Sequence, residues 1–194
     1  MHSSSSELHA RLISITRASP WFMPALHAVR ALELASWCIG AGAVRNMVWD
    51  ALHGFAAPSA LPDIDVAYFE ASGLAPANEG ALQARLAAGM PGVPWEVTNQ
   101  AAVHLWFENY FGHEVAPLAS LEQAVGSWPE YATCVGLALN DDAIQVIAPH
   151  GLDDLFSLTV RHNPARASVE NYHQRLEQKR YRERWPMVRI IEPS

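Results

Sequence analysis

Hydrophobic positions along this chain change repeatedly between helical spacing and short apolar runs. Apolar residues three or four positions apart predict helices, and shorter runs or partly alternating runs predict strands. We expect helices at 8–19, 24–34, 44–53, 79–88, 103–110, just after Ser120, and at 168–184. We expect strands at 37–39, 63–69, 95–97, 134–139 and 143–148, the last two as a hairpin, and a strand or a helix end at 155–160. This order predicts an α+β fold, a small mixed β-sheet with flanking helices.

The length of 194 residues fits a single domain over 1–194, with residues 1–7 as a disordered tail and 165–194 as a helical extension. Half of the residues are hydrophobic, so a core can form without disulfides. We find no apolar run of about 18 residues or more and no secretory signal, so we expect a cytoplasmic protein with no membrane contact. Cys38 and Cys134 lie in apolar runs, which predicts two buried free thiols.

The charge is distributed unevenly. Residues 1–160 carry five arginines, no lysine and sixteen acidic residues, whereas 161–194 carry eight basic and four acidic residues. A formal net charge of −7 argues against a long nucleic acid as partner, because such a polyanion usually meets a basic surface. A small anion needs only local positive charge and backbone N–H groups. Lys179 is the only lysine, so arginine, a metal ion or the backbone must supply most of that charge.

Two carboxylates lie two positions apart in the strand expected at 63–69. Side chains alternate along a strand, so Asp63 and Asp65 point to one face, about 6–7 Å apart, while Ile64 and Val66 point to the core. Such carboxylates repel each other unless a cation lies between them, and hard oxygen ligands of this kind suit Mg²⁺. The alternative is an exposed strand face without function, since Asp-x-Asp is common by itself.

A third carboxylate, Glu96, is the middle residue of the strand expected at 95–97. Its neighbours point one way and Glu96 points the other. On a strand beside 63–66 it would complete a three-carboxylate site. The alternative is an exposed glutamate on an edge strand.

A turn of small residues, Gly40-Ala41-Gly42, joins the strand at 37–39 to the next helix. Glycine allows close approach of the backbone, and the start of a helix offers unpaired N–H groups and a positive dipole end. Both features suit a phosphate group. The alternative is a turn that only packs a strand tightly against a helix.

In this order, the turn, the paired acids and the third acid resemble the nucleotidyltransferase superfamily, whose fold is shared by DNA polymerase beta and tRNA CCA-adding enzymes. Segment 41–46 is similar to the Gly-Gly-x-Val-Arg-Asp of the CCA-adding branch, with Ala41 at its first glycine and Asn46 at its acid. Segment 63–66 matches the Asp-Ile-Asp-Val of that branch. The chain most closely resembles a bacterial nucleotidyltransferase-like family of unassigned substrate, through these segments: Arg45-Asn46 with Trp49-Asp50, 63–66, 95–100 and 151–156.

This resemblance implies the transfer of a nucleoside monophosphate from a nucleoside triphosphate such as ATP to an acceptor by a two-metal mechanism. Asp63 and Asp65 would hold both Mg²⁺ ions, and Glu96 would hold the one nearer the attacking hydroxyl and could accept its proton. The acceptor would be a small molecule or a protein. The nucleotide would bind through Gly40, Ala41, Gly42, Arg45 and Asn46, although Arg45 could instead pair with Asp50 or a strand acid.

Three other segments carry candidates. Asn99 is expected to cap a helix, and Gln100 could line the acceptor site. The acids Asp153 and Asp154 could form a secondary site, with a structural turn as the alternative. The helix at 168–184 is expected to face solvent, but it could bring basic side chains over an anionic ligand: Arg175, Lys179 or Arg182.

Two other function classes compete with the transferase. A non-catalytic nucleotide-binding or regulatory module could retain the fold, and the changes at Ala41 and Asn46 keep that alternative open. A metal-dependent phosphohydrolase would use water as its acceptor.

Trp106 is expected to lie in the core with most of the other tryptophans.

Overall fold

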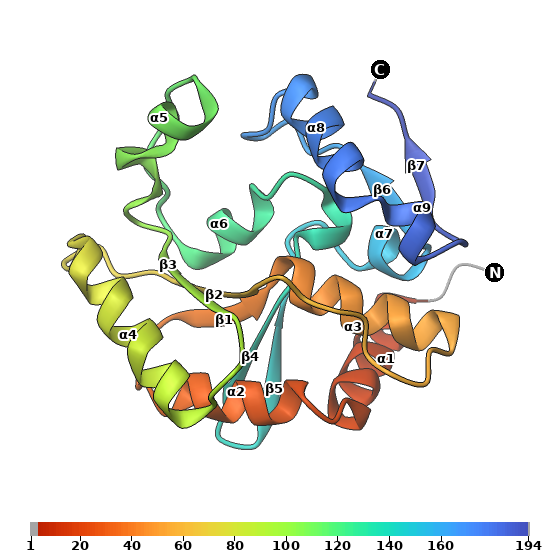
Figure 1. The fold of residues 1–194 in the computed structure, drawn as a ribbon, viewed down its shortest axis with the longest axis horizontal. Helices are drawn as coiled ribbons and strands as arrows, with labels where there is room; N and C mark the ends of the chain where they lie inside the picture. Colours follow the sequence, from red (N-terminus) through yellow and green to blue (C-terminus); the bar gives the residue numbers. More distant parts are fainter. Residues whose placement is uncertain (1–3, 194) are drawn as a thin grey trace.

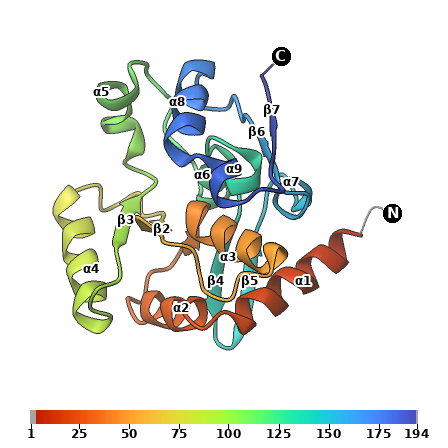
Figure 2. The ribbon, with the colours of Figure 1, turned by 45° about the vertical axis from the view of Figure 1, so that its right-hand side comes forward.

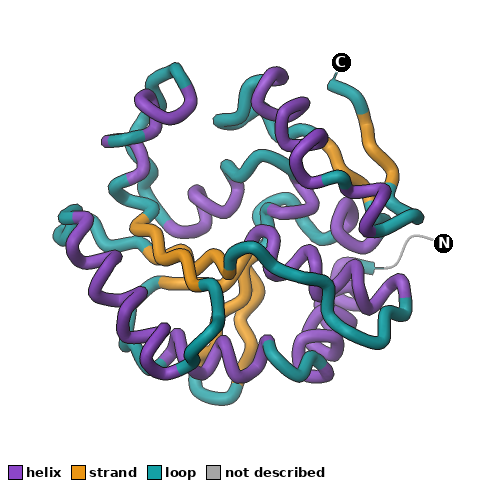
Figure 3. The backbone as a smooth tube through the Cα atoms, viewed as in Figure 1, coloured by secondary structure: helices purple, strands orange, loops and turns teal. Residues whose placement is uncertain are grey.

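A five-stranded mixed sheet forms the centre of the computed structural model, which describes residues 4–193 (Figures 1 and 3). The strand order is β3-β2-β1-β4-β5; β2 and β3 are parallel and the other neighbours are antiparallel. The strands are β1 (Trp37–Gly40), β2 (Ile64–Tyr68), β3 (Trp95–Asn99), β4 (Gly136–Asn140) and β5 (Ala143–Ile147). The predicted mixed sheet and its hairpin are confirmed.

Helices from the first half of the chain cover the sheet below and beside it in the view of Figure 2. Helix α3 packs against β1 and β2, α2 packs against β4, α4 packs against β3, and α1 packs against α3. Their apolar faces meet the buried faces of the strands in one hydrophobic core. The bounds are α1 (Ser5–Ala18), α2 (Phe22–Arg30), α3 (Ala41–His53) and α4 (Pro76–Gly89).

Apart from β4 and β5, which belong to the sheet, the second half of the chain lies over the other side of the sheet (Figure 1). Strands β6 (Thr159–Arg161) and β7 (Arg189–Ile191) form a separate parallel pair. Helix α5 stands on one side of the upper region and α8 on the other, with α6 between them. The helices and 3₁₀ turns are η1 (Val103–Leu105), α5 (Phe107–Phe111), α6 (Leu121–Gly126), η2 (Tyr131–Thr133), α7 (Asp153–Phe156), α8 (Val169–Lys179) and α9 (Tyr181–Arg184).

The structure corrects several predicted elements. Residues 5–7 begin α1 instead of extending a tail, because the Ser4 side chain and Glu7 form a reciprocal capping box; residues 1–3 of that tail lie outside the described residues. The segment 103–110 is not one helix but η1 followed by the short α5. The C-terminal extension is not purely helical, since its end forms β7 against β6.

Two further expectations, the fold class and the state of the cysteines, are confirmed. The fold class is α+β with flanking helices, as predicted. Cys38 and Cys134 are buried free thiols, and burial raises the pKa of Cys134 to about 12. In residues 4–193 no helix is both long and apolar enough to cross a membrane.

Candidate active site

A cavity with a volume of about 530 Å³ opens between α5 and α8. Strands β2 and β3 contribute to its lining together with the first turn of α3. Helix α5 and the segment after it line one side, and the polar face of α8 lines the other (Figure 1). This cavity therefore receives side chains from several segments that are far apart in the sequence.

The three predicted carboxylates all line this cavity. Asp65 on β2 is in register with Glu96 on the parallel neighbour β3, so their Cα atoms belong to strands about 4.8 Å apart. Asp63 precedes β2 by one residue and shares the face of Asp65, because side chains alternate. On β3, Trp95 and Val97 are buried, whereas Glu96 is exposed toward the cavity. Parallel pairing of β2 with β3 is thus what brings the acids together.

The carboxylates of Asp63, Asp65 and Glu96 repel one another, and this repulsion affects their pKa values. Burial first, and then the neighbouring charges of Asp63 and Glu96, raise the pKa of Asp65 to about 7 against the lowering effect of Lys179 and Arg175. Burial and Asp63 also raise the pKa of Glu96. A carboxyl group with a raised pKa accepts a proton more readily near neutral pH. The cluster is therefore suited either to binding a cation or to moving a proton.

The donor set fits a divalent cation, although the carboxylates are not gathered into a finished cluster. Within residues 4–193, no three His, Cys, Asp or Glu side chains stand close enough together to hold a metal ion. Asp63, Asp65 and Glu96 offer hard oxygen atoms on one cavity surface, and no hydrogen bond to these atoms is formed by residues 4–193. Unpaired carboxylates that repel each other are the ligands Mg²⁺ prefers.

The small-residue turn lies at the start of α3, on the opposite side of β2 from β3. Gly40 is the N-cap, and a Cβ there would lie 2.4 Å from the Trp128 ring, so packing requires glycine. Ala41 has φ +50°, in the left-handed region that alanine disfavours. Ala41 and Gly42 line the cavity with the acids, whereas Gly40 does not. The α3 N-terminus thus faces the same space as the carboxylates.

Arg45 lies at the cavity surface but is held by its neighbours. It is 3% exposed, its Nη2 donates to Asn46 Oδ1 at 2.8 Å, and its guanidinium contacts three aromatic rings: Trp49, Tyr181 and Trp185. The predicted alternative pair with Asp50 is wrong, because Asp50 accepts hydrogen bonds from Ser59 and from Trp185 Nε1 instead. Asn46 is buried and lies outside the cavity lining.

Helix α8 was expected to face solvent, with basic side chains over a ligand as the alternative. In the structure one face of α8 forms a basic wall of the cavity. Arg175 and Lys179 line the cavity, whereas Arg182 does not. Burial and Arg175 lower the pKa of Lys179, and the carboxylates of Asp63 and Asp65 oppose this shift. Two cationic side chains therefore lie across the cavity from β3.

A residue that sequence reasoning missed fixes this wall. Glu130, 1% exposed, accepts from Arg175 Nε at 2.7 Å, from Arg175 Nη2 at 3.1 Å and from the Tyr181 hydroxyl at 3.1 Å. Burial alone would raise the pKa of Glu130, but the Arg175 charge and hydrogen bonds hold it below its usual value. Glu130 lies in the loop before η2, where no periodicity or motif marks it.

The remaining candidates divide between site and scaffold. Gln100 lines the cavity. Asn99 does not cap a helix as predicted; it ends β3, and its amide donates hydrogen bonds to the carbonyls of Glu70 and Gly73 in the loop after β2. Asp154 pairs with Arg161 at 3.0 Å, and both Asp153 and Asp154 lie outside the cavity lining. Asp153 and Asp154 therefore fit the alternative given above, a structural role, and not a secondary site.

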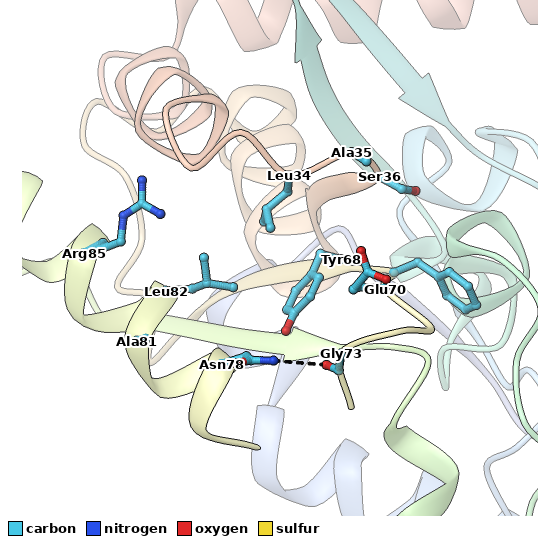
Figure 4. Close-up of a pocket in the computed structure, with 11 residues that line it drawn as sticks. Leu34, Ala35, Ser36, Tyr68, Glu70, Gly73, Asn78, Ala81, Leu82 and Arg85 are labelled. Atoms are coloured by element: carbon cyan, nitrogen blue, oxygen red, sulfur yellow. Dashed lines mark hydrogen bonds between the residues drawn. The ribbon is translucent and has the colours of Figure 1, made fainter. Parts of the chain in front are cut away.

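A second pocket of about 310 Å³ lies between β2 and α4 (Figure 4). Tyr68, three positions after Asp65, points into it and so faces away from the carboxylates. Its polar side chains are paired locally, Asn78 with Gly73 and Glu70 with Ser72. We assign no chemistry to this pocket.

Comparison with known proteins places the fold. A sequence profile described as nucleotidyltransferase matches residues 27–190. The chain belongs to this nucleotidyltransferase family. A structure described as revealing "a CCA-adding enzyme head domain" is similar with TM-score 0.79 and 28% identity over 94% of this chain and 95% of that one. The comparison with curated protein sequences found no significant match.

Two structures of a tRNA-processing enzyme share the fold at lower identity. Apo form I has TM-score 0.50 and 16% identity over 98% of this chain, and apo form 2 has TM-score 0.52 and 18% identity over 86%. This chain spans only 45% and 44% of their lengths. These two similarities concern the fold alone, and they agree with the predicted nucleotidyltransferase-superfamily fold. The family match is what supports a transferase that moves nucleotidyl groups.

Proposed function

We propose that the protein transfers a nucleoside monophosphate from a nucleoside triphosphate to an acceptor hydroxyl, with Asp63, Asp65 and Glu96 as the catalytic and metal-binding residues. The observation that carries this proposal is the in-register pairing of Asp65 with Glu96 on parallel strands, with Asp63 and the α3 N-terminus in the same cavity. The phosphohydrolase and non-catalytic alternatives are outcomes of the test below.

The proposed nucleotide position follows from the charges around the cavity. The triphosphate would lie between the backbone N–H groups at the α3 N-terminus and the basic face of α8, where Arg175 and Lys179 offset its charge. Of the predicted nucleotide-binding residues, Ala41, Gly42 and Arg45 line the cavity and are retained in the proposal. Gly40 and Asn46 would act through the turn and through Arg45.

In the proposed reaction an acceptor oxygen attacks the α-phosphorus, the bond from that phosphorus to the bridging oxygen breaks, and pyrophosphate leaves. Glu96 would take the acceptor proton, and its position in the cavity and its raised pKa support this role. Mg²⁺ held by Asp63, Asp65 and Glu96 would stabilise negative charge on the phosphates and lower the pKa of the attacking hydroxyl. Lys179 would stabilise the charge that develops on pyrophosphate.

The proposal is tested by pyrophosphate release from each NTP with Mg²⁺ and a mixture of cellular metabolites, with mass spectrometry to detect a product heavier by one nucleoside monophosphate. We expect wild type to form such a product and Asp65→Asn to lose at least about a hundredfold in rate, as removal of a group that stabilises transition-state charge does. Asp142→Asn is the matched control, because Asp142 is an exposed acid in the β4–β5 turn.

Three results would contradict the proposal in different ways. Equal rates in wild type and Asp65→Asn with intact NTP binding would support the non-catalytic module. Loss of NTP without any modified acceptor would support the phosphohydrolase. An equal loss of rate in Asp142→Asn would show that the effect does not come from the cavity.

A further inference from the structure

An aromatic surface borders the carboxylates on the side of the cavity opposite α8. Trp106, Tyr110 and Phe111 line the cavity and remain 39%, 80% and 41% exposed. The ring centroids of Trp106 and Tyr110 lie 6.2 Å apart in an edge-to-face pair, and those of Phe107 and Phe111 lie 4.5 Å apart in a tilted pair. The predicted core position of Trp106 is therefore wrong. We call Trp106, Tyr110 and Phe111 the aromatic wall; an exposed cluster of this kind beside a cavity is typical of a binding site.

A polar row leads from the catalytic carboxylate to this wall. Glu96, Thr98 and Gln100 occupy alternate positions along β3 and just beyond it, and all three line the cavity. Gln100 is only 9% exposed, and its side-chain amide forms no hydrogen bond within residues 4–193. Because Gln100 lines the cavity and its amide is not engaged by the protein, the amide is free to hydrogen-bond a ligand there. This free amide is a second observation, independent of the exposed rings, that favours a ligand at this position.

The wall carries little positive charge. Residues 103–118 contain no lysine or arginine but include Glu108 and Glu114. Arg166, which also lines the cavity, lies 5.7 Å over the Phe107 ring and donates through Nη2 to the Ala116 carbonyl, while its buried Nη1 has no hydrogen-bond partner within residues 4–193. A nucleic acid binds largely through phosphate contacts to several basic residues, and one arginine is too few. The wall is therefore better suited to an uncharged compound than to a nucleic acid.

The sheet order places this ligand on the acceptor side of the reaction. Glu96 lies on β3, Asp65 on β2, and the α3 N-terminus follows β1, so the carboxylates separate the aromatic wall from the proposed phosphate site. In an in-line displacement the attacking oxygen approaches from the side opposite the leaving pyrophosphate. A group held on the aromatic wall is on that opposite side.

We propose that the aromatic wall and Gln100 form the acceptor subsite, and that it takes a small, uncharged hydroxyl compound with a planar ring. The ring stacks on Trp106 and Tyr110, Gln100 hydrogen-bonds a polar group of the ring, and the hydroxyl lies near Glu96. This assignment rests on the proposed nucleotidyl transfer, because it uses the carboxylates and the phosphate site as reference points.

The test uses full-length protein labelled with 5-fluorotryptophan, in which ¹⁹F NMR follows Trp106; Trp106→Phe assigns its resonance. The probes are adenosine and 4-hydroxybenzyl alcohol as planar hydroxyl compounds, 1,4-cyclohexanedimethanol as a saturated one, and a short single-stranded RNA. We expect the planar probes to shift the Trp106 resonance. Tyr110→Ala and Gln100→Leu should each weaken their binding about tenfold. Phe55→Ala, which removes a 42% exposed ring outside the cavity, should leave it unchanged.

Binding of an α,β-methylene NTP analogue is measured on the same variants, which separates this inference from the proposed function. Suppose that the analogue binds all variants equally. If the planar probes then bind wild type and Tyr110→Ala alike, or bind no better than the saturated probe, the acceptor assignment is wrong while the proposed nucleotidyl transfer is unaffected. If Tyr110→Ala loses the analogue instead, the wall holds the nucleobase and the assignment is likewise wrong. Tighter binding of the RNA than of the planar probes would also overturn it. Failure of wild type to bind the analogue would refute the proposed function itself.

Discussion

Ala41 occupies a backbone conformation that favours glycine, and Ala41→Gly tests how the turn at the α3 N-terminus is built. Its φ of +50° costs alanine about 1–2 kcal/mol. Glycine removes that strain but gives the unfolded chain more freedom, which costs about 0.4–1 kcal/mol. The lost methyl group is half-buried and costs a further few tenths of a kcal/mol. We therefore expect Ala41→Gly to raise the free energy of unfolding by about 0.5 kcal/mol.

The matched control is Ala51→Gly, an exposed position within the same helix, where glycine should cost about 1 kcal/mol. Urea unfolding followed by circular dichroism measures both variants, and the comparison requires that the slope of the transition stays unchanged. The two variants should differ by about 1.5 kcal/mol with opposite signs relative to wild type. If Ala41→Gly is destabilised as much as Ala51→Gly, the left-handed turn and the strain reasoning are wrong.

Three further predictions concern the walls and floor of the cavity. Glu130→Gln should lower the free energy of unfolding by about 3 kcal/mol, because it leaves Arg175 without a counter-charge. In the same urea assay the exposed Glu177→Gln should change it by less than about 0.5 kcal/mol. Equal effects would contradict a structural role for the Glu130–Arg175 pair. Lys179→Ala should weaken binding of the NTP analogue about tenfold in calorimetry, since a charged contact is lost. Arg182→Ala, on the exposed surface, should leave this binding unchanged. The reverse ranking would show that the phosphates do not bind beside Lys179. Because the folded pKa of Asp65, about 7, lies above its ordinary 3.8, protonation stabilises the fold at low pH and this contribution is lost as pH rises through about 7. In EDTA the Tm of wild type should thus fall between about pH 5 and pH 8 more than that of Asp65→Asn, and identical profiles would refute the shift.

The strands that carry the acids were predictable because their patterns are local. Alternation places Asp63 and Asp65 on one face, and the buried flanks of Glu96 direct it outward. Neighbouring placement of β2 and β3 came from the family resemblance, and the structure then sets their register, Asp65 opposite Glu96. The structure therefore agrees with the sequence in bringing Asp63, Asp65 and Glu96 to the part of the cavity that β2 and β3 form.

Contacts between segments far apart in the chain could not be predicted from the sequence. The α8 segment looks like a solvated helix, because nothing in its own pattern indicates that Glu130 will hold Arg175 across 45 positions. Trp106 looked like a core residue because aromatic residues usually bury their rings, but the chain breaks into η1 and a five-residue α5 there, and the ring stays at the cavity edge. Both errors come from tertiary packing, which local periodicity does not encode.

The central claim is that the acids of β2 and β3 act together on a metal-bound nucleotide, and Mn²⁺ binding tests it most directly. Electron paramagnetic resonance counts bound Mn²⁺ in the presence of the α,β-methylene NTP analogue, whose α–β linkage cannot be cleaved. We expect Asp65→Asn and Glu96→Gln each to weaken Mn²⁺ binding by at least about tenfold, and Asp142→Asn to bind like wild type. Equal Mn²⁺ binding by all four proteins would contradict the claim.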